Sequence, residues 1–108
     1  MVGKPARLKT RAAPKTTPIM KLYVDDVRTP PPGWTVARTV KEAISVLDAG
    51  GVEEVSLDYF IGDGEGGTFL PVAHHLSEMN PSLRPKHIHF HTASSAGAAR
   101  MASVLGQT

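Results

Sequence analysis

Three short apolar runs in this chain each end at polar side chains, and no other feature of the sequence constrains the fold as strongly. The runs and the residues that follow them are 21–24 with Asp25 and Asp26, 54–57 with Asp58, and 87–91 with Thr92 and Ala93. In an open parallel sheet the carboxyl ends of the strands meet at one edge, so we expect these side chains to lie together there. Carboxylates gathered at one edge repel one another unless a cation or a proton lies between them, which makes this edge a candidate site for a hard metal ion.

The segments around these runs alternate between strand and helix. Strands are expected at residues 21–26, 34–38, 53–57 and 87–92. Helices are expected after Thr39, after Thr68 and after Ser94 or Ser95, because each hydroxyl can accept a hydrogen bond from the first turn of a helix. Such alternation indicates right-handed crossovers and a parallel sheet covered by helices. The sequence therefore predicts an α/β fold, a small three-layer domain with a four-stranded, mainly parallel sheet whose last strand is an edge.

Apolar spacing gives each expected helix an inner face. Thr39 and Glu42 form a capping box, in which each side chain satisfies a backbone donor of the other residue, and this helix ends at Gly50. Pro71 lies in the first turn of the second helix, where its missing N–H is tolerated, and Asn80 closes that helix. The expected inner positions are Val40, Ala43, Ile44 and Leu47, then Phe69, Val72, Ala73, Leu76 and Met79, then Ala98, Met101, Ala102 and Leu105.

Length and composition restrict the class of protein. The 108 residues and 41% hydrophobic content are enough for one modest core. The chain contains no cysteine, which excludes disulfides, thiolate metal sites and cysteine nucleophiles. No apolar run approaches the roughly 18 residues of a membrane span, and the basic start lacks the apolar segment of a secretory signal. We therefore expect a soluble, cytoplasmic protein with no membrane partner.

Residues 1–19 differ in composition from the remainder of the chain. They contain three prolines, and the first acidic residue of the chain is Asp25. The basic residues of this segment are Lys4, Arg7, Lys9, Arg11 and Lys15. Without apolar periodicity, the segment is expected to be a disordered basic arm ahead of a folded domain at 20–108, and it could contact nucleic acid weakly by neutralising phosphates. Alternatively, the folded protein starts at Met20 and the arm is an upstream extension or a remnant of expression.

An ordered set of short motifs supports a family resemblance. The motifs are LYVDDVR at 22–28, PPGW at 31–34, SLD at 56–58, HFHTA at 89–93 and GAARM at 97–101. Together they resemble the cyclic-phosphate processing receiver-like family, which has a truncated response-regulator receiver fold. The resemblance spans Met20 to about Leu105 and implies a receiver-like (flavodoxin-like) domain. It also implies a divalent cation and a cyclic phosphate, either an RNA terminus or a cyclic nucleotide.

The chain also departs from the family pattern. Tyr59 and Phe60 stand where the family usually has a histidine and a second acid, and Ser94 and Ser95 stand where it usually has Asn-Pro. These departures leave open whether the implied activity is weakened, retuned or lost. A signalling receiver has a lysine after a fifth strand, and this chain has neither, which disfavours phosphorelay through Asp58.

The acidic side chains are the expected metal ligands. Adjacent residues of a strand point to opposite faces, so Asp25 and Asp26 can both approach one metal only where the chain turns. With Asp58 they could hold magnesium or manganese through two or three carboxylates, while water and substrate phosphate fill the other positions. The alternative is that these acids serve only as caps of turns or helices.

Three alternating histidines share one face of the last strand. His87, His89 and His91 are each separated by roughly 6 to 7 Å along the strand, so one ion cannot readily reach all three. Only His91 lies at the carboxyl end beside Thr92, where it could act as a general acid or base. His87 and His89 are expected to be packing or edge residues.

The phosphate-binding groups are expected to be arginines and hydroxyls. Arg28 and Arg100 could each bind phosphate bidentately, or could instead neutralise the acids. Ser94 and Ser95 precede the last helix, whose N–H groups favour an anion, although a capping serine has a structural role in any case. The resemblance places the hydroxyl of Thr92 in the catalytic pocket.

These expectations combine into two alternative functions. The first is metal-assisted binding and hydrolysis of a cyclic phosphate ester, with His91, Asp58 and Thr92 as catalytic residues and a cyclic-phosphate nucleotide or RNA end as substrate. The second is a non-catalytic receiver-like module that binds a protein through its helical face or its edge strand.

Overall fold

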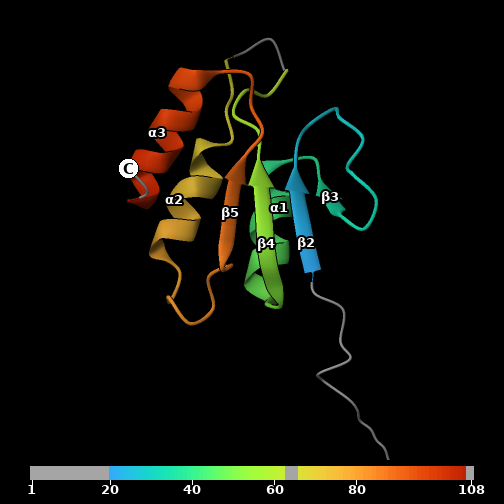
Figure 1. Cartoon of the computed structure of the whole chain (residues 1–108), viewed down its shortest axis with the longest axis vertical. Coiled ribbons are helices and arrows are strands. Elements are labelled where there is room, and N and C mark those ends of the chain that lie inside the picture. Colours follow the sequence, from blue (N-terminus) through green and yellow to red (C-terminus); the bar gives the residue numbers. More distant parts are fainter. Residues whose placement is uncertain (1–19, 63–65, 107–108) are drawn as a thin grey trace, which may run out of the picture.

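A central parallel sheet organises the described part of the chain. The computed structural model describes residues 20–62 and 66–106, so the expected arm at 1–19 lies outside the described residues. The strands are β2 (Met20–Val24), β3 (Thr35–Ala37), β4 (Val52–Leu57) and β5 (His87–Phe90). They are all parallel and lie in the order β3-β2-β4-β5 (Figure 1). The prediction of a four-stranded parallel sheet with the last strand at an edge is confirmed.

The first helix, α1 (Val40–Ala49), begins after the predicted cap Thr39, but Glu42 does not accept a hydrogen bond from Thr39 N as a capping box requires. Thr39 Oγ1 accepts a hydrogen bond from Glu42 N at 3.0 Å. The Glu42 carboxylate accepts from Arg38 N at 2.7 Å and so satisfies the donor one residue before the cap. Gly50 ends the helix with a φ of 86°, in a region that favours glycine.

The second helix, α2 (Leu70–Glu78), has a different start from the one predicted. Thr68 Oγ1 accepts from Leu70 N at 3.3 Å, but the residue at the cap position is Phe69, which has no side-chain acceptor. Thr68 instead forms an isolated antiparallel bridge with Phe60. This bridge fixes the entry to the helix, so Thr68 acts through a turn rather than as the cap.

The third helix, α3 (Ser95–Leu105), is capped by Ser94, whose Oγ accepts from Gly97 N at 2.9 Å. Met101 and Leu105 are buried as predicted, whereas the third buried position is Gly97. A Cβ at Gly97 would overlap the Tyr59 ring, so the absent side chain lets the helix approach the segment after β4.

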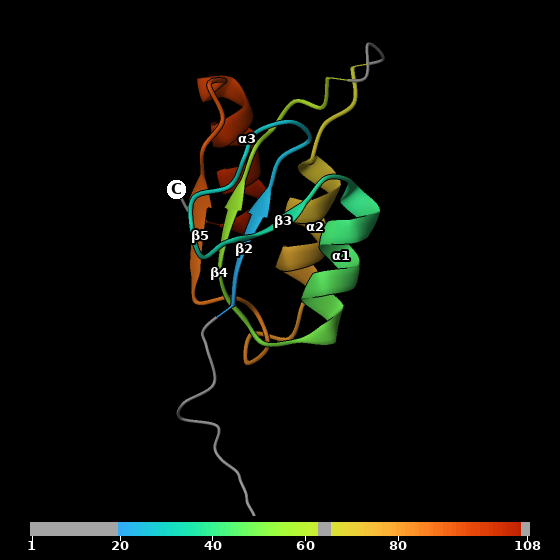
Figure 2. The same cartoon turned by 90° about the vertical axis from the view of Figure 1, so that its right-hand side faces the viewer.

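The predicted fold class, a small α/β receiver-like domain with a four-stranded parallel sheet and three helices, is confirmed. α1 and α2 lie on one side of the sheet and α3 packs on α2 beside β5, so the helices form one layer instead of the two expected (Figure 2). The connections from β3 to β4 and from β4 to β5 both run across the sheet from the β3 edge towards the β5 edge. Because both crossovers are right-handed, their helices α1 and α2 lie on the same face of the sheet. The connection from β2 to β3 progresses in the opposite direction. It is the proline-rich segment 25–34, which forms no helix to cover the other face.

The core lies between this helical layer and the sheet. Leu22 and Val24 of β2 and Val55 and Leu57 of β4 are fully buried against the helices. Side chains alternate between the two faces along a strand, so the residues between these buried ones point to the face that carries no helix. On this helix-free face, Tyr23, Ser56 and His89 are aligned across β2, β4 and β5. Within residues 20–62 and 66–106, no helix has the length and apolar character that a membrane crossing requires.

Candidate functional site

The carboxyl ends of β2, β4 and β5 bring three candidate ligands together. Asp25, Asp58 and His91 each offer one ligand atom, and these atoms all lie within 4.8 Å of one another. Backbone hydrogen bonds extend the sheet to these residues, from Asp58 N to Val24 O at 2.9 Å and from His91 N to Leu57 O at 3.0 Å. The three side chains are therefore fixed by the ends of adjacent strands. We call them the rim cluster.

Asp25 is the most enclosed member of the rim cluster, since its side chain is 0% exposed. Its Oδ1 accepts from the backbone N–H groups of Val27 and Arg28, both at 2.9 Å, and its Oδ2 lies 2.9 Å from His91 Nε2. Burial alone would raise the pKa of Asp25, but the two backbone donors and His91 outweigh burial and hold the pKa below its ordinary value. The carboxylate is therefore ionised at neutral pH.

His91 is held on three sides. Its Nε2 faces Asp25, its Nδ1 lies 2.8 Å from Ser56 Oγ, and its ring stacks on Tyr23 with centroids 4.1 Å apart and planes 8° apart. An ionised carboxylate can only accept, so Nε2 carries a hydrogen. In the neutral ring, Nδ1 therefore accepts from the Ser56 hydroxyl. His91 was predicted at this edge, whereas Ser56 and Tyr23 were not predicted as its neighbours. Both occupy alternating positions of adjacent strands that point to the same face as His91, and this spacing was the signal that could have identified them.

The two other predicted acids have different surroundings. Asp26 does not join the rim cluster, because its Oδ2 accepts from Gly62 N at 2.6 Å and ties the end of β2 to the segment after β4. Asp58 Oδ1 accepts from Tyr59 N at 2.7 Å. Its Oδ2 makes no hydrogen bond within residues 20–62 and 66–106 and is thus an available oxygen ligand.

The structure brings one of the two predicted arginines to the rim cluster. Arg28 Nη1 donates to His91 O at 3.0 Å, and its Nε lies 3.9 Å from Asp25 Oδ2. Arg100 is exposed on α3 and has no hydrogen bond or ion pair within the described ranges. A third arginine, Arg38, was missed. Its Nη1 donates to Arg28 O at 2.7 Å and to Asp25 O at 3.3 Å, and its position directly after β3 was the signal that could have identified it.

The predicted hydroxyls mainly build the backbone near the site. Thr92 Oγ1 accepts from Ser94 N at 3.1 Å, and Ser94 caps α3. Ser95 is exposed at the first position of that helix. Ser94 is therefore the capping serine and has the structural role that was the predicted alternative to phosphate binding. The catalytic role of Thr92 remains a prediction.

The remaining histidines lie away from the rim cluster. His89 Nε2 is 2.7 Å from Glu54 Oε2, and His75 Nε2 is 2.7 Å from Asp48 Oδ1. His87 is exposed on β5. Among the described residues only His91 joins a group that could hold a metal ion.

Tyr59 and Phe60, which directly follow Asp58, lie in two different environments. Tyr59 is buried in the core, where it lies against Gly97. Phe60 is 56% exposed and meets the Tyr59 ring edge to face at 4.9 Å. Tyr59 thus contributes to packing, and Phe60 presents an apolar surface near the carboxyl end of β4.

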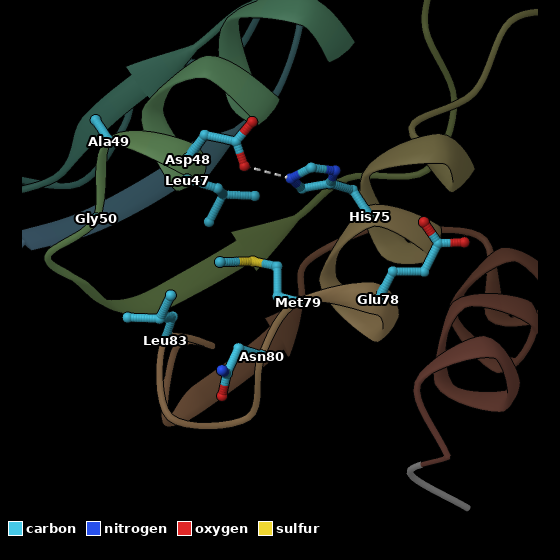
Figure 3. Close-up of a pocket in the computed structure, with 9 residues that line it drawn as sticks. All are labelled: Leu47, Asp48, Ala49, Gly50, His75, Glu78, Met79, Asn80 and Leu83. Atoms are coloured by element: carbon cyan, nitrogen blue, oxygen red, sulfur yellow. Dashed lines mark hydrogen bonds and ion pairs between the residues drawn. The ribbon is translucent and has the colours of Figure 1, made fainter.

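A pocket of about 500 Å³ lies at the opposite end of the sheet (Figure 3). It is formed where α1 and α2 end, with Leu47, Met79 and Leu83 among its apolar lining and the pair of Asp48 and His75 at its edge. None of the predicted site residues lines it.

Comparisons with known proteins agree with the topology and with the motifs. The Cyclic-phosphate processing Receiver domain family matches residues 20–107. Searches of curated proteins and of solved structures gave no significant match. The family match covers more than half of the chain and includes every strand that supplies the rim cluster. The chain therefore belongs to the cyclic-phosphate processing receiver domain family.

Proposed function

We propose that this domain binds a divalent cation and a cyclic phosphate ester at the rim cluster and hydrolyses the ester. The observation that carries the proposal is the convergence of Asp25, Asp58 and His91 within 4.8 Å at the carboxyl ends of parallel strands. The family match supports the substrate class.

The donor set fits a small divalent cation. Asp25 Oδ2 and the available Asp58 Oδ2 are hard oxygen ligands, which suit magnesium and manganese. His91 lies close to both carboxylates, but its Nε2 carries the hydrogen that Asp25 accepts and its Nδ1 faces Ser56, so the two carboxylates are the proposed ligands and His91 keeps its role with the proton. A bound cation would offset the carboxylate charges and polarise a phosphoryl oxygen.

Arg28 is the residue best suited to hold the phosphate. Its guanidinium is anchored to His91 O, yet the side chain remains 49% exposed. Arg38 supports it by holding the Arg28 carbonyl. Two cationic groups next to the rim cluster would attract an anion that the carboxylates alone would repel.

His91 is the proposed proton carrier. Asp25 and Ser56 fix the ring orientation and its tautomer, and its side chain is 16% exposed. The ring would donate the Nε2 proton to the leaving oxygen as the cyclic ester opens, or would take a proton from water. Tyr23, stacked on the ring, would keep it from rotating.

A hydrolysis screen tests this proposal. Purified protein would be incubated with 2′,3′-cyclic and 3′,5′-cyclic phosphates, with and without magnesium or manganese, and the products separated by chromatography. We expect metal-dependent opening of at least one ester, which Asp58→Asn should largely remove. Asp48→Asn is the matched control, because Asp48 lies at the opposite end of the sheet. Inactivity towards every cyclic phosphate with both metals would contradict catalysis.

One observation favours the non-catalytic alternative. Both nitrogens of His91 and both oxygens of Asp25 already have partners within the protein. The rim cluster could therefore serve only to brace the ends of the strands, with exposed Val27 and Phe60 available to a protein partner. The screen separates the alternatives, since a module of this kind would show no turnover.

A further inference from the structure

The helix-free face of the sheet carries a continuous row of aromatic rings. His91 stacks on Tyr23 at 4.1 Å, and Tyr23 meets Trp34 edge to face, with centroids 6.0 Å apart and planes 78° apart. We call these three side chains the aromatic row. Tyr23 and Trp34 are only partly buried and do not belong to the hydrophobic core. The row begins at the rim cluster, crosses β2 and ends at the residue before β3.

Cationic side chains border the aromatic row at both ends. Lys21 Nζ lies 5.8 Å from the centroid of the Trp34 ring, in contact with the end remote from the rim. Arg28 and Arg38 lie at the rim end. The acid nearest to the row is Asp25 of the rim cluster, whose Oδ2 lies 2.9 Å from His91 Nε2, and away from the rim Glu54 is paired with His89 at 2.7 Å. Outside the rim cluster, the cationic groups along the row therefore complement a chain of phosphates.

We propose that the helix-free face binds the single-stranded 3′ end of an RNA, with a base stacked on Trp34 and the terminal phosphate at the rim cluster. This inference rests on the proposed function for the position of the terminal phosphate. Unpaired bases stack on aromatic side chains of open sheet faces, and cationic groups follow the backbone. His91 belongs to both surfaces, so the face is continuous with the candidate catalytic site.

One feature favours RNA over DNA, and a second favours an RNA end over a cyclic mononucleotide. A 2′,3′-cyclic phosphate requires a ribose 2′-hydroxyl, which DNA lacks. Lys21 is separated from the rim cluster by Tyr23 and Trp34, so it is placed to contact a second phosphate. A mononucleotide has no second phosphate to offer.

The fluorescence of Trp34 gives a direct test, because it is the one tryptophan of the chain. The probe is a short single-stranded oligoribonucleotide with a 3′-phosphate, which cannot undergo ring opening. We expect saturable quenching by this probe, weaker quenching by a nucleoside 3′-phosphate and none by inorganic phosphate. Unchanged Trp34 emission while a labelled probe still binds would place the RNA elsewhere and overturn the inference.

Variants sharpen the test. Trp34→Ala should weaken binding of the labelled probe by about 5- to 100-fold, the range expected for one stacked base, whereas Trp34→Phe should retain most of the affinity. Lys21→Ala should lower both the affinity and its dependence on salt. Lys41→Ala is the matched control, because Lys41 is exposed on α1 on the other side of the sheet. Equal losses for the two lysine variants would contradict a contact at this face.

The two proposals fail in different ways. Asp58→Asn should abolish hydrolysis, and quenching of Trp34 by the oligoribonucleotide is measured in the parent protein, in which the rim cluster is intact. Quenching without any hydrolysis by the parent protein would contradict the proposed function and support the RNA-binding face. Hydrolysis of cyclic phosphates by a protein whose Trp34→Ala variant binds the probe as tightly as the parent would overturn the RNA-binding face alone.

Discussion

Each neighbour of His91 controls a different property of its ring. Asp25 fixes which nitrogen carries the hydrogen, Ser56 occupies the other nitrogen, and Tyr23 limits rotation of the ring plane. A side chain restrained in this way loses little conformational entropy on reaching a reactive geometry. The candidate general acid or base is thus preorganised before any ligand binds.

Substitution of His91 is the most direct test of its chemistry. We expect His91→Ala to lower turnover of a responsive cyclic phosphate by roughly a hundredfold or more, the scale of lost general acid–base catalysis. His87→Ala should have a much smaller effect, because His87 is exposed on the same strand far from the rim cluster. Steady-state rates with circular dichroism spectra of both variants provide the measurement. Equal, small losses of turnover in both variants would show that His87 and His91 have only structural roles.

The environment of Asp25 predicts a pH dependence of stability. Its pKa is lower in the folded protein than in the unfolded chain, where it is about 3.9, so its contribution is present above that value and is lost as the pH falls through the folded pKa. Asp25→Asn should therefore be less stable than the parent at neutral pH, and the difference should shrink below about pH 4. Urea unfolding across the acid range measures both curves. A constant difference at all pH values would contradict this account.

Adjacent residues at the end of β2 show what sequence reasoning could not decide. Asp25 and Asp26 are adjacent residues of the same type, so the sequence does not distinguish them. The turn that follows β2 directs Asp25 into the rim cluster and Asp26 towards Gly62 N. The turn is set by backbone donors of Val27 and Arg28, whose placement depends on tertiary contacts. Hence the edge of the sheet was predictable, whereas the membership of the cluster was not.

Among the elements, the bounds of α1 and the inner faces of the helices were the most predictable features, whereas the predicted cap of α2 was wrong. Thr39 and Gly50 bound α1 as expected, and the buried side of α2 contains Val72, Ala73 and Leu76. These signals are local, since they depend on residues within one or two turns. The position of Gly97 against Tyr59 is not local, because it joins α3 to the segment after β4.

Gly97 therefore provides a test at the scale of the helix. Helix propensity favours alanine over glycine by roughly 0.8–1 kcal/mol, so an open position would be stabilised by the change. Because a Cβ at Gly97 would overlap the buried Tyr59 ring, we expect Gly97→Ala to lower the free energy of unfolding by about 1–3 kcal/mol instead. Chemical denaturation measures the difference. An increase in stability would show that the ring and the helix separate at little cost.

At the scale of the whole molecule, cation binding should stabilise the fold. A ligand that binds only the native state raises its stability according to concentration and affinity. Millimolar manganese or magnesium should raise the melting temperature of the parent protein, and Asp58→Asn should largely remove the rise. Asp48→Asn should preserve it. A melting curve that does not respond to either metal would contradict the metal site.

The basic arm gives a second prediction at this scale. The described core is built from β2 onwards, with Leu22 and Val24 in its centre. Deletion of residues 1–19 should therefore leave the far-ultraviolet circular dichroism spectrum and the melting temperature nearly unchanged. A large loss of helicity in the shortened protein would show that the arm is part of the fold.

The strand order has a consequence for how the chain reaches its native state. β2 pairs with β4 through Leu22 and Val55, and β4 pairs with β5 through Val55 and Ile88, so both pairings join residues about thirty positions apart in the sequence. Loop closure therefore costs the two pairings about the same entropy, and neither is favoured to form first on that ground. Because β4 lies between β2 and β5, Asp25 and His91 meet only after both pairings have formed.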